Sequence, residues 1–125
     1  MPRYFRASKA DRTDADGTVF DSRGEMRRWH ELRLLERTGQ ISMLERQVKF
    51  PIVINRKQLA LRSTRFHKGG RAVVYVADFV YIDKTGDKIV EEFKGVWNDA
   101  ARIKVALVEL LYGIEIQITG KGKLV

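Results

Sequence analysis

Two segments rich in β-branched and aromatic residues, joined by a short polar turn, constrain the fold of this chain more than any other feature. Residues 71–82 (RAVVYVADFVYI) and 88–94 (KIVEEFK) have the composition of β-strands. The loop between them, residues 84–86, has three positions and ends in glycine, which is typical of a hairpin whose last loop residue is left-handed. The sequence therefore predicts an antiparallel hairpin.

The turn also predicts the register of the hairpin. When the residues that flank the loop are paired, Asp78 lies opposite Glu92, and Lys94 points to the same face two residues further on. Directly opposed carboxylates repel each other, so we expect a cation to offset their charge. Lys94 supplies part of that charge, and Mg²⁺, which prefers hard oxygen ligands, would supply the rest. The alternative is a salt bridge among the three side chains without a metal, and a slip of one residue would put Glu91 in place of Glu92.

Strict alternation assigns the neighbouring apolar residues to two faces. Val76 and Val80 are expected on the face of Asp78, and Ala77 and Phe79 are expected on the opposite face. Because both faces are apolar, we expect a central hairpin that other elements cover on both sides.

The rest of the chain supplies helices and strands around this hairpin. The predicted elements are, in order, a helix over residues 22–38, a strand within residues 44–54, the hairpin, a helix that begins after Asn98 and ends at Gly113, and a strand over residues 114–118. Pro51 lacks an amide hydrogen, so the first strand is an edge strand or is interrupted there. Residues 55–70 are basic and predict a loop or an irregular extension. The order α-β-β-β-α-β predicts an α/β fold with a mixed central sheet flanked by helices.

The ends of the chain differ from this core. Residues 1–18 mix basic and acidic side chains with little apolar periodicity and predict a flexible N-terminal arm. Residues 120–125 predict a basic tail, which leaves residues 19–119 as one domain. The sequence has no cysteine, no apolar run of membrane-spanning length and no signal-peptide pattern, so we expect a cytoplasmic protein with no membrane partner.

The charge of the chain favours a polyanionic partner. There are 24 Lys and Arg residues against 16 Asp and Glu residues, a net charge of +8 at pH 7. Nucleic acid is the leading partner, ahead of an anionic membrane surface, because neutralised phosphates release their counterions. Arg65, Lys68 and Arg71 belong to the densest basic segment, and we expect them to contact DNA. Arg102 and Lys104 in the second predicted helix are also expected there, although a solvated helix surface explains these two equally well.

At this point the residues resemble a known pattern. Asp78, the segment 92–94 (EFK) across the hairpin and Glu25 on the preceding helix resemble the motif of the PD-(D/E)XK nuclease superfamily, whose core has the order α-β-β-β-α-β. The segments FDSRGE, YVADF and VEEFKG more narrowly resemble a family of small phage-encoded proteins within it, endonucleases similar to Holliday-junction resolvases. The resemblance covers residues 19–118 and implies a restriction-endonuclease-like core. One departure is Ala77, which stands where the superfamily usually has proline.

The resemblance implies a Mg²⁺-dependent endonuclease that cleaves DNA, with Mn²⁺ as a substitute metal and branched or junction DNA as a candidate substrate. Asp78, Glu92 and the Phe93 carbonyl would bind the metal, which neutralises charge and lowers the pKa of bound water. Lys94 would orient the attacking water and stabilise charge on the phosphate. Glu25 would bind metal or water, although a glutamate three residues after a serine is also a complete capping box.

Three further expectations complete this interpretation. Related nucleases often carry a glutamine near the mouth of the active site, which Gln47 would supply; a surface hydrogen-bonding residue is the alternative. Small nucleases without a specificity domain often form homodimers to cut two strands, and a phage-encoded one would act in the host cytoplasm. The competing functions are a non-catalytic nucleic-acid-binding protein of the same fold and an assembly protein with an acidic protein partner.

Overall fold

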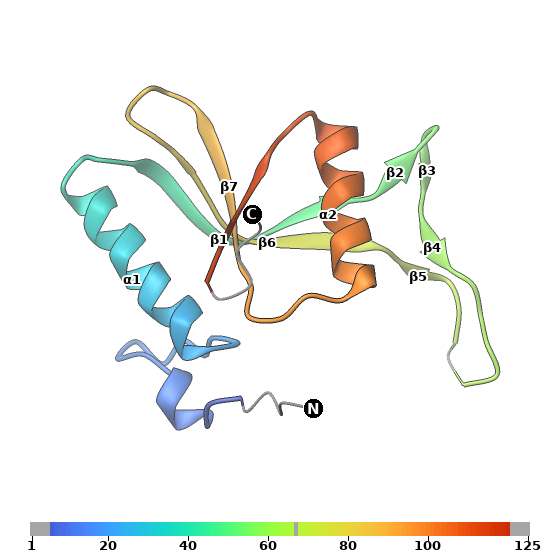
Figure 1. The fold of residues 1–125 in the computed structure, drawn as a ribbon, viewed down its shortest axis with the longest axis horizontal. Helices are drawn as coiled ribbons and strands as arrows, with labels where there is room; N and C mark the ends of the chain where they lie inside the picture. The colour runs from blue at the N-terminus through green and yellow to red at the C-terminus, as the bar shows by residue number, and fades with distance from the viewer. Residues whose placement is uncertain (1–5, 67, 121–125) are drawn as a thin grey trace.

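A four-stranded sheet with a helix against each face forms the centre of the computed structural model, which describes residues 6–66 and 68–120 (Figure 1). The helices are α1 (Arg23–Arg37) and α2 (Asp99–Tyr112), and a 3-10 turn, η1, spans Ala10–Arg12. The strands are β1 (Ser42–Pro51), β2 (Val53–Ile54), β3 (Lys57–Gln58), β4 (Ala60–Leu61), β5 (Arg71–Ala72), β6 (Val74–Ile82), β7 (Lys88–Phe93) and β8 (Ile116–Thr119).

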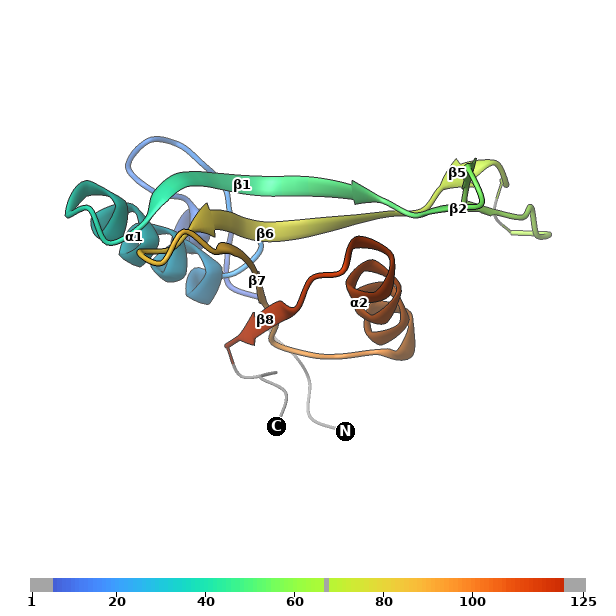
Figure 2. The same cartoon turned by 90° about the horizontal axis from the view of Figure 1, so that it is seen from above.

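The main sheet is mixed, as the sequence predicts. Its strand order is β1-β6-β7-β8, in which β7 and β8 run parallel and the other neighbours run antiparallel. β1 is an edge strand and ends at Pro51, which confirms the prediction from that proline. The two helices lie near opposite ends of the long strands β1 and β6 (Figures 1 and 2). No helix in the described part of the chain is both long and apolar enough to cross a bilayer.

Both helices begin and end where local sequence signals place them. The Ser22 side chain accepts a hydrogen bond from the Glu25 N–H at 3.1 Å and begins α1, which ends before Thr38. The Asn98 side chain accepts from the Ala101 N–H at 2.8 Å and begins α2. These caps satisfy backbone donors within a few residues of themselves, so the sequence alone predicts both helices to within a residue or two.

The hairpin of β6 and β7 has the predicted register. Phe79 pairs with Glu91 and Ile82 pairs with Lys88, and Gly86 in the loop is left-handed with a φ of +88°. When this register is continued by one position, Asp78 lies level with Glu92. The three-residue turn was sufficient to predict this pairing because it fixes where the two strands start.

The alternation of side chains along β6 reverses at Asp78, which corrects the predicted faces. Ala77 packs with Val80 in the cluster under α2, whereas Phe79 packs in the cluster under α1. On the neighbouring strand, Gln47 has a left-handed φ of +53°, yet β1 and β6 keep the same register before and after it. Both strands are therefore irregular at the same level. This irregularity takes Asp78 out of the alternating pattern of the core.

The segment predicted as a loop or an irregular extension, residues 55–70, contains two short strands, β3 and β4. β2 pairs with β3 in one short hairpin, and β4 pairs with β5 in a second. We call residues 53–72 the crosspiece, because the two hairpins lie across the end of the main sheet beyond α2 (Figure 1). The strand signal is weak here because all eight residues of these strands are exposed, so no apolar face has to be formed.

The N-terminal segment predicted as a flexible arm makes specific contacts in its described part. The Arg12 side chain donates to the Phe20 carbonyl at 2.7 Å, and the buried Asp14 side chain lies 3.5 Å from His30 Nε2 on α1. Residues 6–18 are therefore not a free arm. Of the predicted tail 120–125, only Gly120 belongs to the described residues.

A buried ion pair joins α1 to the middle of the sheet. Glu91 is fully buried, and both of its carboxylate oxygens accept hydrogen bonds from the Arg28 guanidinium. The Tyr81 hydroxyl donates to the same carboxylate at 2.8 Å. Glu91 therefore lies on the face covered by α1, and its charge is offset within the fold.

We expect Arg28→Met to lower the free energy of unfolding by about 3 kcal/mol, because it leaves the buried Glu91 charge without its cation. Arg27→Met removes an exposed arginine from the preceding position of α1 and should change the free energy of unfolding by less than about 0.5 kcal/mol. Urea denaturation of the two variants beside the wild type measures the difference. Equal stability of both variants would show that the ion pair does not hold α1 to the sheet.

Candidate active site

A pocket of about 340 Å³ lies beside the C-terminal end of β7 and the first turn of α1. It is lined by Asp21, Ser22, Glu25, Gln47, Val76, Asp78, Glu92, Phe93, Lys94, Gly95 and Val96. A second pocket shares Glu92 and Lys94 with it and extends to Asn98 and Lys104 at the start of α2. Four of the predicted catalytic residues thus converge from α1, β6 and β7 on one place.

Hydrogen bonds fix the two carboxylates of the hairpin that line this pocket, Asp78 and Glu92. Asp78 Oδ2 accepts from the Phe93 N–H at 2.8 Å. Glu92 Oε2 accepts from the Tyr75 hydroxyl at 2.8 Å, and its other oxygen lies 3.3 Å from Lys94 Nζ. Each carboxylate therefore has one oxygen tied to the surrounding strands, and the predicted neighbourhood of Asp78, Glu92 and Lys94 is what the structure shows.

Glu25 joins this group because α1 approaches the sheet closely at its first turn. A Cβ atom on Gly24 would overlap the present position of the Phe93 ring, so glycine allows this approach without moving the ring. The Gln47 amide lies 3.3 Å from Glu25 Oε1 and 3.4 Å from Asp78 Oδ1 and links the two carboxylates. The capping interpretation and the site interpretation of Glu25 are thus compatible, since its backbone N–H bonds to the cap while its side chain lines the pocket.

Negative charge in the pocket is poorly compensated. Burial, followed by repulsion from Asp78, raises the pKa of Glu25 to about 7, although Arg46 at 3.8 Å acts in the opposite direction. Burial also raises the pKa of Asp78 to about 6, opposed by the Phe93 N–H and reinforced by repulsion from Glu92. A cation in this pocket would favour the ionised form of both carboxylates.

The donor chemistry of the pocket fits Mg²⁺. Among the described residues no three carboxylate or imidazole side chains form a ready cluster around one point. Mg²⁺ does not require such a cluster, because it commonly binds one or two carboxylates and keeps waters or phosphate oxygens as its other ligands. Asp78 and Glu92 supply two carboxylates at neighbouring strand positions, and Glu25 is linked to Asp78 through the Gln47 amide.

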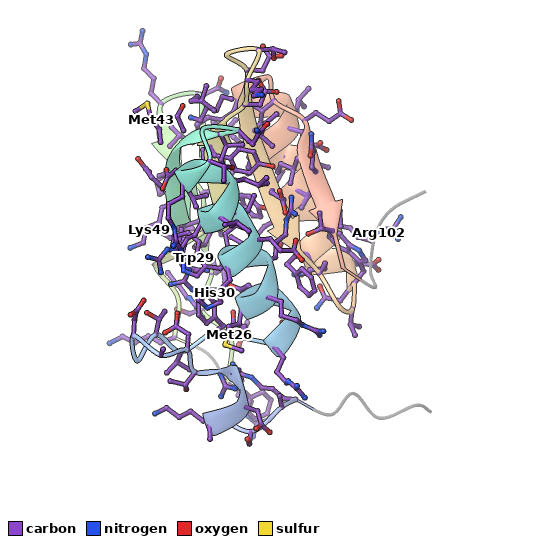
Figure 3. All side chains as sticks on the ribbon, turned by 90° about the vertical axis from the view of Figure 1, so that its left-hand side faces the viewer. Met26, Trp29, His30, Met43, Lys49 and Arg102 are labelled. Atoms are coloured by element: carbon purple, nitrogen blue, oxygen red, sulfur yellow. The ribbon has the colours of Figure 1, made fainter. Side chains whose placement is uncertain are left out.

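The other predicted residues fall into two groups. Gln47 lies in the pocket itself, and Lys104 lines the adjoining one. Arg102 is exposed and lies 3.6 Å from Asp99 within α2, on the side of the molecule away from Lys49 of β1 (Figure 3). The remaining three, Arg65, Lys68 and Arg71, lie in the crosspiece and line no part of the first pocket.

Two residues of the site were missed from the sequence. Tyr75 was interpreted only as a strand residue, but its hydroxyl holds Glu92. Arg46 was not singled out, yet its guanidinium lies 4.2 Å from the centre of the Phe20 ring and close to Glu25. No sequence signal identifies either contact, because each depends on how β1 and β6 twist relative to their neighbours.

The fold and the pocket define a mixed α/β protein with a carboxylate-lined site at one end of its central hairpin. The chain belongs to the DUF1064 family, described as a protein of unknown function, whose family model matches residues 5–121. No curated protein and no solved structure matches the chain.

Without a divalent metal, the stability of the protein should fall as the pH rises from about 5 to 8. The pKa of Glu25 is raised from 4.5 to about 7, so the folded state holds this proton more tightly than the unfolded chain does. The resulting stability is present below the unfolded pKa and is lost as the pH rises through the folded one; Asp78 acts in the same direction near pH 6.

Thermal melts in EDTA across this pH range test the expectation. Glu25→Gln should flatten the decline, whereas Glu115→Gln, a change at an exposed carboxylate outside the pocket, should melt in parallel with the wild type. A Glu25→Gln variant with the full wild-type decline would show that Glu25 ionises normally.

Proposed function

We propose that this protein is a Mg²⁺-dependent endonuclease that hydrolyses DNA phosphodiester bonds, with Mn²⁺ as a substitute metal. The observation that carries the proposal is the convergence of Asp78, Glu92, Lys94 and Glu25 on one pocket. The element order α1, β1, β6, β7, α2, β8 supports a restriction-endonuclease-like core, because it matches the PD-(D/E)XK order that the motif resembles.

The carboxylates would hold the metal. Asp78 and Glu92 supply anionic oxygens, and the Phe93 carbonyl between Glu92 and Lys94 would supply a third ligand. Bound Mg²⁺ supplies charge neutralisation at the phosphate and lowers the pKa of a coordinated water. Glu25 would hold this metal or a water beside it, at the position where the Gln47 amide now links it to Asp78.

Lys94 would act on the phosphate. Its ammonium lies 3.3 Å from Glu92 Oε1 and 5.4 Å from the centre of the Trp97 ring, so it is held at the rim shared by the two pockets. There it can donate to a phosphate oxygen and stabilise the charge that develops in the transition state. The Tyr75 hydroxyl is a positioning group, because it fixes the other oxygen of Glu92.

The second pocket gives a path for the DNA strand. Lys104 lines it together with Lys94 and Glu92, so a strand that crosses from one pocket to the other passes this ammonium group. Branched or junction DNA is the proposed substrate, and a homodimer would bring two such pockets to two strands. A DNA substrate would place the protein in the cytoplasm, that of the host where the chain is phage-encoded.

A non-catalytic nucleic-acid-binding protein of the same fold is the second candidate. It is favoured by one observation, the net charge of +8, which favours a polyanionic partner whether or not the pocket cleaves it. The two candidates differ in a single property, metal-dependent cleavage.

Asp78→Asn and Glu92→Gln should each abolish nicking of supercoiled plasmid and of a four-way junction in Mg²⁺, because each removes an anionic ligand. Both variants should fold, since the new amides retain an oxygen that accepts from the Phe93 N–H and the Tyr75 hydroxyl. Lys94→Ala should cleave at least about a hundredfold more slowly and still bind metal, because lysine donates to phosphate and does not ligate Mg²⁺.

Thermal melts with and without Mg²⁺ accompany the cleavage assay. Glu115→Gln is the matched control and should cleave at the wild-type rate. Wild-type cleavage by the Asp78 and Glu92 variants would exclude the pocket as a nuclease site, and stable DNA binding without cleavage by the wild type would support the second candidate.

A further inference from the structure

We infer that the crosspiece, residues 53–72, is a DNA-binding arm that lies in a groove of the duplex next to the bond to be cleaved. The inference rests on the proposed function for the position of that bond, but its own evidence is separate. It comes from the charge of the crosspiece, its attachment to the sheet and its shape.

The region around the crosspiece holds the whole net positive charge of the chain. Residues 46–77 contain eight of the 24 Lys and Arg residues and none of the 16 Asp and Glu residues, so the remainder of the chain has 16 of each sign. Six of these eight cations belong to the crosspiece and are exposed: Arg56, Lys57, Arg62, Arg65, Lys68 and Arg71. The crosspiece thus carries +6 of the net charge of +8, and charge of one sign gathered on one projecting element favours a polyanion at that element.

Hydrogen bonds join the crosspiece to the end of the sheet. The Leu59 N–H donates to the Ile52 carbonyl at 2.8 Å, the Val73 N–H to the Leu59 carbonyl at 2.8 Å, and the Ile52 N–H to the Val73 carbonyl at 3.1 Å. The Gln58 amide nitrogen lies within 3.1 Å of all three carbonyl oxygens. This closed set of bonds fixes where both hairpins leave the end of the sheet.

The shape of the crosspiece suits a groove of DNA. Each half is a two-stranded hairpin with every strand residue exposed, and the major groove of B-form DNA admits a two-stranded β-ribbon. In the view of Figure 1, the loop between β4 and β5 and the loop between β7 and α2, which begins with Lys94, both extend below the long strands β1 and β6, and Figure 2 shows them at different depths. A duplex along this side would meet both the hairpin and the pocket.

The loop between β4 and β5 also carries an exposed aromatic ring. Phe66 is 83% exposed, and the Arg65 guanidinium lies 5.7 Å from its centre. In the major groove such a ring can contact apolar atoms at the base edges, such as the thymine methyl group, while the cation beside it contacts a phosphate. We therefore place the ring against bases and the cations along the backbone.

The experiment compares two triple variants with the same loss of charge. Arg62→Gln, Arg65→Gln and Arg71→Gln are combined in the crosspiece, and Arg27→Gln, Arg37→Gln and Lys84→Gln are combined on the body, all at exposed positions. Binding to a short DNA duplex is measured in EDTA, which prevents cleavage, over a series of salt concentrations. Melting temperatures confirm that both triple variants fold.

We expect the crosspiece variant to bind about tenfold or more weakly and the slope of log K against log salt to become shallower by about 2 to 3, because three phosphate contacts are lost. The body variant should change that slope by less than about 1. Phe66→Ser should weaken binding about tenfold with the slope unchanged, because an apolar contact to base edges releases no counterions.

Equal DNA affinity and equal salt dependence of the two triple variants would overturn the proposed DNA-binding arm. Binding of the wild-type protein to anionic vesicles and not to the duplex would also overturn it. Unchanged affinity of Phe66→Ser would overturn the placement of this loop in the groove. Nicking of plasmid by the wild type separates the two proposals. If the wild type nicks plasmid and both triple variants bind DNA equally, the proposed nuclease activity stands and the DNA-binding arm is excluded. If the wild type does not nick plasmid but the crosspiece variant binds DNA more weakly than the body variant, the DNA-binding arm stands and the proposed nuclease activity is excluded.

Discussion

The structure depends on how a hairpin buried on both faces accommodates its carboxylates. A buried carboxylate is costly unless it finds hydrogen-bond donors or a cation. Glu91 receives the guanidinium of Arg28 from α1, Glu92 receives a tyrosine hydroxyl and an ammonium, and Asp78 receives a backbone N–H. The position of α1 and the irregular backbone at the level of Asp78 and Gln47 both serve to bring these partners to the hairpin.

Two neighbouring glutamates show the difference between a structural and a functional carboxylate. Glu91 and Glu92 are adjacent in sequence and both buried, but they face opposite sides of the sheet. Glu91 is enclosed with a matching guanidinium, so nothing further can reach it. Glu92 shares an open pocket with Asp78 and Glu25, whose pKa values are raised because burial and mutual repulsion exceed the local positive charge. Uncompensated charge that remains accessible is the physical mark of the proposed site.

The proposed site of DNA cleavage and the proposed DNA-binding element lie in different parts of the molecule. The pocket is formed by strands and a helix whose positions the core fixes, which holds reacting groups within narrow limits. Most of the net positive charge lies elsewhere, because six of the eight cations of residues 46–77 belong to the crosspiece, which contributes no buried residue to either core cluster. The basic element can therefore vary without disturbing the carboxylates, and the requirements for stability and for binding a polyanion do not conflict.

The sequence by itself determined the features that depend on short-range bonding. The three-residue turn set the register that puts Asp78 level with Glu92, and Ser22 and Asn98 set where the helices begin. Tertiary structure alone decided the reversal of faces at Asp78 and the pairing of β4 with β5. The physical reason is range: a cap or a tight turn is satisfied within a few residues, whereas these features depend on contacts between segments distant in the chain, and no local pattern records them.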